Sequence, residues 1–189
     1  MIGATRRLVI LDRDGVINVD RDDYVRSVAQ WQPIDGSIDA IAALHQAGFL
    51  IGVATNQSGI GRGYYTRDTL YGMHRKMRRL VARAGGRIDA IAYCPDLPNS
   101  GSVCRKPAPG MLLQLADKLN RTLPEAIMVG DSERDLEAGA AVGCELFLVR
   151  TGKGRDTERR LAATPTSWSA NVTVCDDLAE VAQRLLSSS

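Results

Sequence analysis

The sequence predicts a single α/β domain over residues 1–189, with a doubly wound parallel sheet of the Rossmann-like type. First, short apolar runs alternate with helical patterns along the chain, and there is no internal repeat. Second, polar residues directly follow several of these runs, and such sheets bind ligands beyond the carboxyl ends of their strands. The 189 residues, 44% hydrophobic and 24% charged, suit one domain with its own core.

The elements of the first half follow from apolar runs and the residues that end them. The continuous apolar run 8–11 is typical of a strand buried on both faces. A helix is expected from about Ser37 to a glycine stop, followed by a buried strand at 49–54. Thr66 is a predicted N-cap for a helix whose apolar residues recur at helical spacing, and a third strand is expected at 88–93.

The second half continues the alternation after a loop. Residues 94–110 are rich in Pro, Gly, Ser and Asn, which predicts that loop. The later elements are expected as a helix at 111–119, a strand at 126–129, a helix that runs to Gly143, strands at 145–149 and 172–174, and a helix at 177–186. Neither this loop nor the stretch before the first helix is long enough for a large cap domain, so we expect an open site.

The positive and negative charges of the chain are nearly balanced. The chain has 24 Lys and Arg against 22 Asp and Glu, a net charge of +2, which makes no general case for nucleic acid. The cations within 75–83 read as the solvated face of one helix. No apolar run predicts a membrane span or a signal peptide, so we expect a cytoplasmic protein with reduced cysteines. No large amphipathic stripe is left over in the sequence, so we expect a monomer.

Four groups of polar residues should converge at the carboxyl edge of the sheet. In chain order, they are Asp12 and Asp14 after the first strand, Thr55 and Asn56 after the second, Arg105 and Lys106 after the third, and Asp131 and Asp135 after the fourth. Because the carboxyl ends of parallel strands share one edge, residues distant in sequence are brought together there.

The pair Asp12 and Asp14 predicts a cation site. Two carboxylates two residues apart at the end of an extended strand point the same way and repel unless a cation lies between them. Asp131 would add a third oxygen ligand, and Mg²⁺ is the natural ion beside phosphates. A surface pair or a helix cap is the simpler alternative, but an apolar run that delivers both acids to one edge disfavours it.

These residue types suit phosphoryl transfer. Asp12 can attack phosphorus as a nucleophile, and Asp14 can act as acid and base. Lys106 and Thr55 can supply donors to the charge on the phosphoryl oxygens. Ser132 with Asp135 also reads as a helix N-cap, which leaves open whether Asp135 has any other role.

Four segments resemble the motifs of the haloacid dehalogenase phosphatases, and more closely their D-glycero-D-manno-heptose 1,7-bisphosphate 7-phosphatase branch. The segments are Leu11-Asp12-Arg13-Asp14-Gly15-Val16-Ile17-Asn18, Thr55-Asn56-Gln57-Ser58-Gly59, Cys104-Arg105-Lys106-Pro107 and Gly130-Asp131-Ser132. The resemblance covers about residues 8–152 and implies an Mg²⁺-dependent phosphatase that acts through an aspartyl phosphate. The related histidinol-phosphate phosphatases share many of these residues and are the alternative.

The resemblance also implies individual roles. Mg²⁺ would be bound by the side chains of Asp12 and Asp131 and by the backbone carbonyl of Asp14, while Thr55 and Lys106 would hold the transferring phosphate. The residues implied in substrate binding are Asp20 and Tyr24 in a loop, Asn56, Gln57 and Ser58 after the second strand, and Arg105, which would recognise the second phosphate.

The sequence departs from the family in one loop. Where relatives often hold a structural zinc with Cys-x-His and Cys-x-Cys, this chain has Cys94-Pro95-Asp96 and Ser102-Val103-Cys104. Two thiols, a carboxylate and a serine are a poor zinc set, so we expect no tightly bound zinc. A weak site made by Cys94, Asp96 and Cys104, or a disulfide between the two cysteines on oxidation, stays open.

Other functional classes remain as alternatives. A phospho-Asp receiver domain would also carry acids, Thr and Lys at strand ends, but Asp14 would hasten loss of its phosphate. A module that only binds an anion and Mg²⁺ would not need the complete catalytic set. The run 56–63 and the cation Arg105 favour a sugar bisphosphate over histidinol phosphate. They do not decide between the α and β anomers, on which the choice between lipopolysaccharide and nucleotide-sugar pathways depends.

Overall fold

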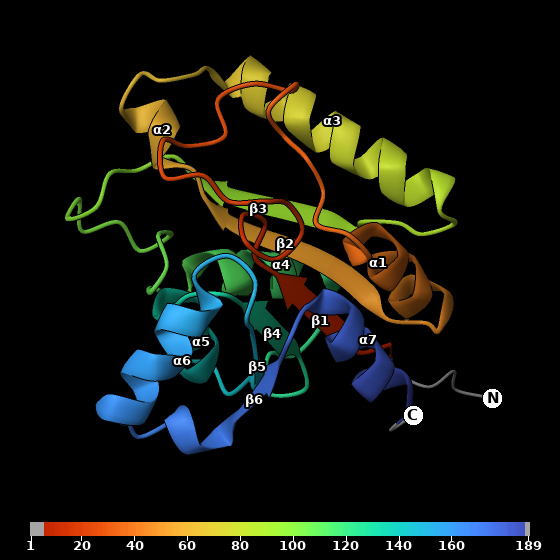
Figure 1. Ribbon diagram of the computed structural model, residues 1–189, viewed down its shortest axis with the longest axis vertical. Coiled ribbons are helices and arrows are strands. Elements are labelled where there is room, and N and C mark those ends of the chain that lie inside the picture. Colours follow the sequence, from red (N-terminus) through yellow and green to blue (C-terminus); the bar gives the residue numbers. More distant parts are fainter. Residues whose placement is uncertain (1–5, 188–189) are drawn as a thin grey trace.

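The computed structural model describes residues 6–187 and has the predicted α/β architecture (Figure 1). Parallel strands form a six-stranded sheet in the order β3-β2-β1-β4-β5-β6. Their bounds are β1 Leu8–Leu11, β2 Leu50–Asn56, β3 Ala90–Cys94, β4 Ile127–Gly130, β5 Glu145–Val149 and β6 Val172–Cys175. The strand order therefore reverses between β1 and β4, which is where doubly wound sheets bind ligands.

Helices cover both faces of the sheet, as buried parallel strands require. One face carries α1 (Ser37–Gln46), α3 (Arg67–Arg83) and α7 (Leu178–Ser187). The other carries α4 (Gly110–Leu119), α5 (Glu133–Ala140) and α6 (Gly154–Ala163). Two short elements, α2 (Ser58–Gly61) and the 3-10 helix η1 (Ser169–Asn171), complete the described helices.

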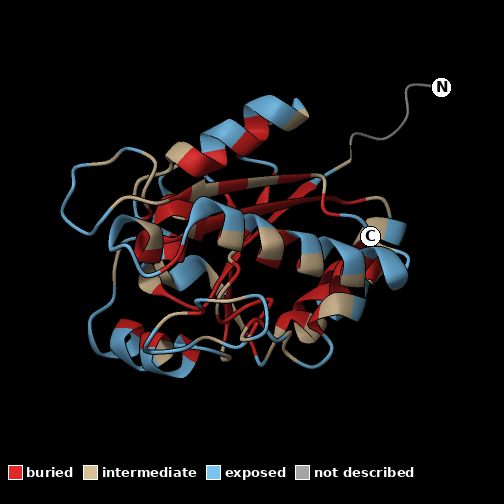
Figure 2. Cartoon of the chain, turned by 90° about the horizontal axis from the view of Figure 1, so that it is seen from above, coloured by how far each residue is buried: buried red, intermediate tan, exposed pale blue. Residues whose placement is uncertain are grey.

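The strand β1 shows why the strands of this sheet are continuous apolar runs in the sequence. Val9 and Leu11 belong to the core shared with α1, α3 and α7, while Leu8 and Ile10 belong to the core on the opposite face. Successive side chains of a strand point to opposite faces, so a strand covered on both sides needs apolar residues at every position. Figure 2 shows these buried strands between helices whose outer faces are exposed.

The helix α3 follows the predicted pattern closely. Thr66 is its N-cap, and its side-chain oxygen accepts a hydrogen bond from the backbone N–H of Thr69 at 3.2 Å. Most of the cations within 75–83 are exposed, as expected for a solvated face. In the part of the chain that is described, no helix is long and apolar enough to cross a membrane.

The sequence did not predict α6, and it placed some boundaries differently. The buried residues of α6 are Gly154, Thr157 and Leu161, so its inward face holds one large apolar side chain and its helical pattern is weak. Thr55 and Asn56, expected just beyond the second strand, are the last residues of β2. The helix α5, expected to reach Gly143, ends at Ala140.

Candidate active site

All but one of the polar residues predicted after the first four strands line one pocket of about 240 Å³. The predicted site residues that line it are Asp12, Asp14, Asp20, Tyr24, Asn56, Gln57, Ser58, Arg105, Lys106 and Asp131. Thr55 is buried and is not among the lining residues. Because the carboxyl ends of the parallel strands share one edge of the sheet, residues as far apart in sequence as Asp12 and Asp131 lie in the same pocket.

Lys106 lies at the centre of the site with a side chain that is 1% exposed. Its Nζ lies 2.8 Å from Asp12 Oδ1 and 2.6 Å from Asp135 Oδ1, and it donates to the carbonyl oxygen of Ala54 at 2.7 Å. These partners satisfy the three donors of an ammonium group. Burial by itself lowers the pKa of Lys106, but the charges of Asp12 and Asp135 raise it above the usual value, so the side chain stays protonated.

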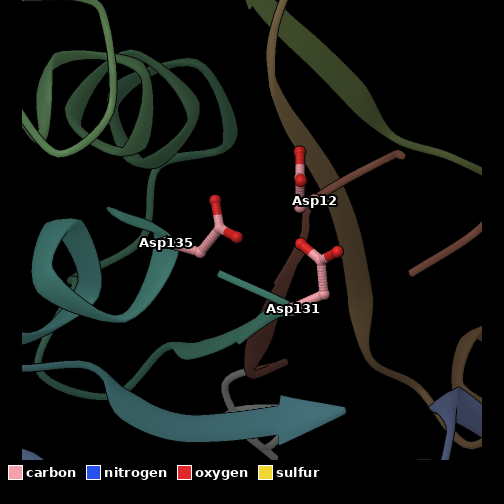
Figure 3. A group of neighbouring side chains, drawn as sticks. All are labelled: Asp12, Asp131 and Asp135. Atoms are coloured by element: carbon pink, nitrogen blue, oxygen red, sulfur yellow. The ribbon is translucent and has the colours of Figure 1, made fainter. Parts of the chain in front are cut away.

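Asp12, Asp131 and Asp135 form an acidic group, with one carboxylate oxygen of each within 4.8 Å of the others. Asp12 follows β1, Asp131 follows β4, and Asp135 lies in the first turn of α5. Figure 3 shows the three side chains pointing toward one another. The side chain of Asp14 is not part of this group; the ligand predicted from Asp14 is its backbone carbonyl, and that remains a prediction.

Asp131 is held by two loops that approach it closely. Its Oδ2 accepts a hydrogen bond from the backbone N–H of Lys153 at 2.8 Å. A Cβ atom at Gly15 would lie 2.1 Å from this oxygen, and one at Gly152 would lie 2.2 Å from it. Gly15 also has a φ of 83°, which disfavours other residues. The chain therefore turns at Gly15 and passes against Asp131.

The donor set and its charge balance fit Mg²⁺. Burial raises the pKa of Asp12 to about 7 even though Lys106 lowers it, because Asp135 and Asp14 add negative charge. Burial and the charges of Asp135 and Asp12 raise the pKa of Asp131 to about 8. Lys106 supplies one positive charge against these three acids, so two negative charges of the group have no matching cation. A hard divalent ion that prefers carboxylate oxygens would balance them.

Asp14 has its own cation, which the sequence reasoning did not foresee. The guanidinium of Arg13, with a fully buried side chain, donates from Nη2 to both Asp14 oxygens at 2.8 and 2.9 Å. Asn18 and Gln57 donate to the same carboxylate at 2.9 and 2.8 Å. Burial by itself raises the pKa of Asp14, but Arg13 and these hydrogen bonds lower it below the usual value. The expected cation beside Asp14 is thus the residue next to it in sequence.

Gln57 joins the catalytic candidates through its buried amide. Its Nε2 donates to Thr55 Oγ1 at 2.7 Å as well as to Asp14, and its Oε1 accepts from the hydroxyl of Tyr65 at 2.6 Å. Both ends of the amide therefore have partners inside the protein. These contacts orient Thr55 and Asp14, while the substrate contact predicted for Gln57 stays a prediction.

Asn56 and Arg105 position the loop that carries Lys106. The side-chain amide of Asn56 donates to the carbonyl oxygen of Lys106 at 3.0 Å and accepts from its backbone N–H at 3.1 Å. Arg105 is half-buried, and its Nη1 donates to the carbonyl oxygen of Asp96 at 3.0 Å. The end of β2 and the loop after β3 are thereby joined at the residue that bears the buried ammonium.

The loop after β1 borders the pocket with Asp20 and Tyr24. Asp20 Oδ2 lies 3.1 Å from Lys153 Nζ. The ring of Tyr24 packs edge-to-face on Tyr64, with 5.3 Å between centroids. A hydrogen bond with Ser58 is the main cause that lowers the pKa of the Tyr24 hydroxyl. The predicted substrate residues Asp20, Tyr24 and Ser58 therefore all line the pocket, with roles that stay predictions.

Hydrogen bonds link the residues of the cysteine loop. Cys94 Sγ lies 3.5 Å from Asp96 Oδ2 and 3.7 Å from Ser102 Oγ, while Cys104 Sγ accepts from Gln114 at 3.3 Å. All four cysteines are free thiols, and Cys144 and Cys175 are buried as expected. Among residues 6–187, the acidic group at Asp12 is the one cluster of three metal-ligating side chains. The expectation of no tightly bound zinc stays a prediction.

Besides Arg13, two further residues of the site were missed from the sequence. Lys153 binds Asp131 through its backbone and Asp20 through its side chain. It follows β5, so the same reasoning from the carboxyl edge of the sheet could have found it. Arg134 lines the pocket from the first turn of α5, where the sequence indicated only a helix cap. No pattern in the sequence distinguishes it from an ordinary surface arginine.

The proteins that this chain resembles in sequence and in structure include several heptose bisphosphate phosphatases. A family model described as HAD-hydrolase-like matches residues 103–181. The D-glycero-β-D-manno-heptose-1,7-bisphosphate 7-phosphatase of Pseudomonas putida is 49% identical over 180 residues, covering 95% of this chain and 99% of its own. That of Neisseria meningitidis serogroup A is 54% identical over 151 residues, covering 80% and 81%. The crystal structure of D,D-heptose 1,7-bisphosphate phosphatase from B. bronchiseptica, complexed with magnesium and phosphate, has a TM-score of 0.90 at 46% identity, covering 97% of this chain and 99% of its own.

Proposed function

Because the chain belongs to the D-glycero-D-manno-heptose 1,7-bisphosphate 7-phosphatases of the haloacid dehalogenase superfamily, which are phosphoric monoester hydrolases, we propose that it removes the 7-phosphate of D-glycero-β-D-manno-heptose 1,7-bisphosphate. The sequence left the anomer open. The names of relatives that match almost the whole chain support the β anomer.

The observation that carries the proposal is the pairing of Asp12 with the buried Lys106 beside Asp131. The Asp12 Oδ1–Lys106 Nζ distance is 2.8 Å, and all three residues line the same pocket. A carboxylate presented to a pocket beside a fixed cation can attack a phosphoryl group whose negative charge that cation attracts. Neither a structural ion pair nor a helix cap requires this arrangement to face a pocket.

In the first step, an oxygen of Asp12 attacks phosphorus and forms an aspartyl phosphate while the P–O bond to the sugar breaks. Asp14 passes a proton to the departing sugar oxygen, and because Arg13 keeps its carboxyl ionised in the free protein, Asp14 first takes up that proton from the bound phosphate group or the solvent. The ammonium of Lys106 stabilises the charge on the phosphoryl oxygens, while the same role predicted for Thr55 requires its buried hydroxyl to reach them. Arg13, Asn18 and Gln57 hold the carboxyl of Asp14 in place for this transfer.

In the second step, Asp14 accepts a proton from a water molecule, which attacks phosphorus and releases phosphate and free Asp12. Asp12 and Asp131, with the backbone carbonyl of Asp14, would hold Mg²⁺. When bound, this ion supplies positive charge against the phosphoryl oxygens and balances the acidic group. Asp135 is a positioning residue, because its Oδ1 lies 2.6 Å from Lys106 Nζ and holds the ammonium in place.

The test is magnesium-dependent phosphate release from three substrates measured side by side: the β and α anomers of the heptose bisphosphate, and histidinol phosphate. We expect the β anomer to have the highest kcat/KM and activity to disappear when Mg²⁺ is chelated. A preference for histidinol phosphate would overturn the substrate and leave the phosphatase activity. An aspartyl phosphate that forms but is not hydrolysed would instead favour a receiver-like signalling role.

A further inference from the structure

Five cations line the pocket in addition to Lys106. Four of them have partners, because Arg13 pairs with Asp14, Arg21 with Asp23 and Lys153 with Asp20, and Arg105 donates to a backbone carbonyl. In the part of the chain that is described, Arg134 forms neither a hydrogen bond nor an ion pair. The acids beside it in sequence have other partners, because Glu133 faces Arg160 and Asp135 holds Lys106.

The position of Arg134 places it where a substrate would extend from the reacting centre. It lies three residues after Asp131, in the first turn of α5, and its side chain is exposed. It lines the pocket that contains Asp12 and also an adjoining hollow bordered by the loop 98–108. Arg105 is the other arginine that lines both spaces.

The charge of Arg134 acts directly on Arg105. After burial, it is the main cause that lowers the pKa of the Arg105 guanidinium. It also opposes the protonation of Lys153. Bringing like charges together without an acidic partner costs free energy, and a bound anion with more than one negative charge removes that cost. The grouping is therefore better matched to a liganded protein than to a free one.

We propose that Arg134 is a specificity-determining residue that, together with Arg105, binds the phosphate that is not transferred. This inference rests on the proposed function, in which the substrate carries two phosphates. Lys106 serves the transferred phosphate, so a second phosphate needs a separate cationic site. A guanidinium fork matches two phosphate oxygens, and an arginine with no protein partner can turn toward them without breaking an existing bond.

The test compares two substrates that differ only in the second phosphate: the heptose 1,7-bisphosphate and the heptose 7-phosphate. We expect Arg134→Ala to lower kcat/KM for the bisphosphate by about 10- to 100-fold and to change it for the monophosphate by less than about 3-fold. Arg134→Lys should restore part of the loss, since it keeps the charge without the fork. The matched control is Arg79→Ala, because Arg79 is exposed on α3 and lines neither space.

A double variant tests whether the two arginines share one ligand. Arg105→Ala should also impair the bisphosphate more than the monophosphate. If both side chains hold the same phosphate, the loss in Arg105→Ala with Arg134→Ala should be smaller than the product of the two single losses. Equal losses on both substrates in Arg134→Ala, or no loss on either, would overturn the inference for Arg134 and leave the proposed function standing.

Activity measurements on the wild-type protein distinguish a failure of this inference from a failure of the proposed function. If it does not hydrolyse the heptose bisphosphate at all, the proposed function fails, and the inference fails with it. If it hydrolyses both substrates equally well, the substrate is accepted but no second-phosphate site exists, and the inference alone is wrong.

Discussion

Lys106 bonds to Asp12, to Asp135 and to the carbonyl oxygen of Ala54 at the same time, and its backbone is held by Asn56. A buried ammonium with all three donors used has little freedom to move. These contacts come from the end of β1, from β2 and from the first turn of α5, so the position of this cation relative to the nucleophile depends on three elements that meet at the sheet edge. That rigidity is what electrostatic stabilisation of a transition state requires.

At the residue scale, Asp12→Asn should abolish turnover and leave the protein folded. Lys106 keeps Asp135 and Ala54 as partners, so no buried charge is left unpaired. We expect a loss of about 10³-fold or more in kcat, with a melting temperature within a few degrees of the wild type. Asp35→Asn, on an exposed acid outside the pocket, is the control. Substantial residual activity would refute Asp12 as the nucleophile.

Asp131→Asn should remove stabilisation by Mg²⁺. In the wild type, an ion that binds the acidic group stabilises the folded state, by about 2.7 kcal/mol at a hundredfold excess over Kd. The asparagine variant lacks one of the two side-chain ligands, so its melting temperature should respond weakly to Mg²⁺. Thermal unfolding with and without Mg²⁺ measures this, again beside Asp35→Asn. An equal response in Asp131→Asn would mean that the ion binds elsewhere.

At the scale of an element, the N-terminus of α5 combines two functions. Asp135 Oδ2 accepts hydrogen bonds from Ser132 N–H at 3.0 Å and Ser132 Oγ at 2.6 Å, which completes a capping box. Its Oδ1 holds Lys106. Burial by itself raises the pKa of Asp135, but Lys106 and Ser132 lower it. One carboxylate therefore begins a helix and orients a catalytic cation.

The cap of α3 offers a prediction about stability alone. Thr66→Ala removes the acceptor for the backbone N–H of Thr69, so we expect a loss of about 1 kcal/mol in the free energy of unfolding. Thr66→Ser keeps the oxygen and should retain most of the stability. Because Thr66 does not line the pocket, kcat/KM should be unchanged. Chemical denaturation gives the first quantity, and an unchanged midpoint in Thr66→Ala would show that the cap contributes nothing.

At the scale of the molecule, the strand order decides where the site lies. The central strand β1 is paired with β2 on one side and β4 on the other, so Asp12 and Asp131 end neighbouring strands. The helices occupy the two faces, and the carboxyl edge is bordered by loops rather than by a large cap. An edge of this kind accommodates an extended substrate, and residues on the loops select it.

The stability of the whole domain should fall below pH 6.5 because of one buried histidine. Burial, and secondarily the charge of Arg13, lowers the pKa of His74 to about 3, and its Nε2 has no partner among the described residues. His74 binds a proton near pH 6.5 in the unfolded chain but only near pH 3 in the folded protein. The stability that the neutral His74 allows is therefore fully present above pH 6.5 and is lost as the pH falls toward 3. The loss from pH 7 to pH 5 is about 2 kcal/mol.

His74→Leu tests this contribution. Leucine cannot bind a proton, so the difference in unfolding free energy between pH 7 and pH 5 should be about 2 kcal/mol smaller than in the wild type. Urea denaturation at the two pH values measures it in both proteins. The same pH dependence in His74→Leu and the wild type would show that other groups are responsible.

The sequence by itself determined the fold class and most of the site. Apolar runs that alternate with helical patterns admit few architectures other than a covered parallel sheet, and the residues after those runs must meet at its carboxyl edge. This reasoning was sufficient for Asp12, Lys106 and Asp131, which line one pocket as expected. It was insufficient for α6, whose polar composition leaves a weak periodic signal.

Only the tertiary structure decided how the residues pair. Arg13 pairs with Asp14, Asn56 hydrogen-bonds to the backbone of Lys106 across 50 positions, and Arg134 has no partner among residues 6–187. The physical reason is that strand geometry is local. The position of a residue just after an apolar run is enough to place it at the carboxyl edge of the sheet. The partner that a charge finds there depends on side-chain directions and distances between segments that only the packed sheet brings together.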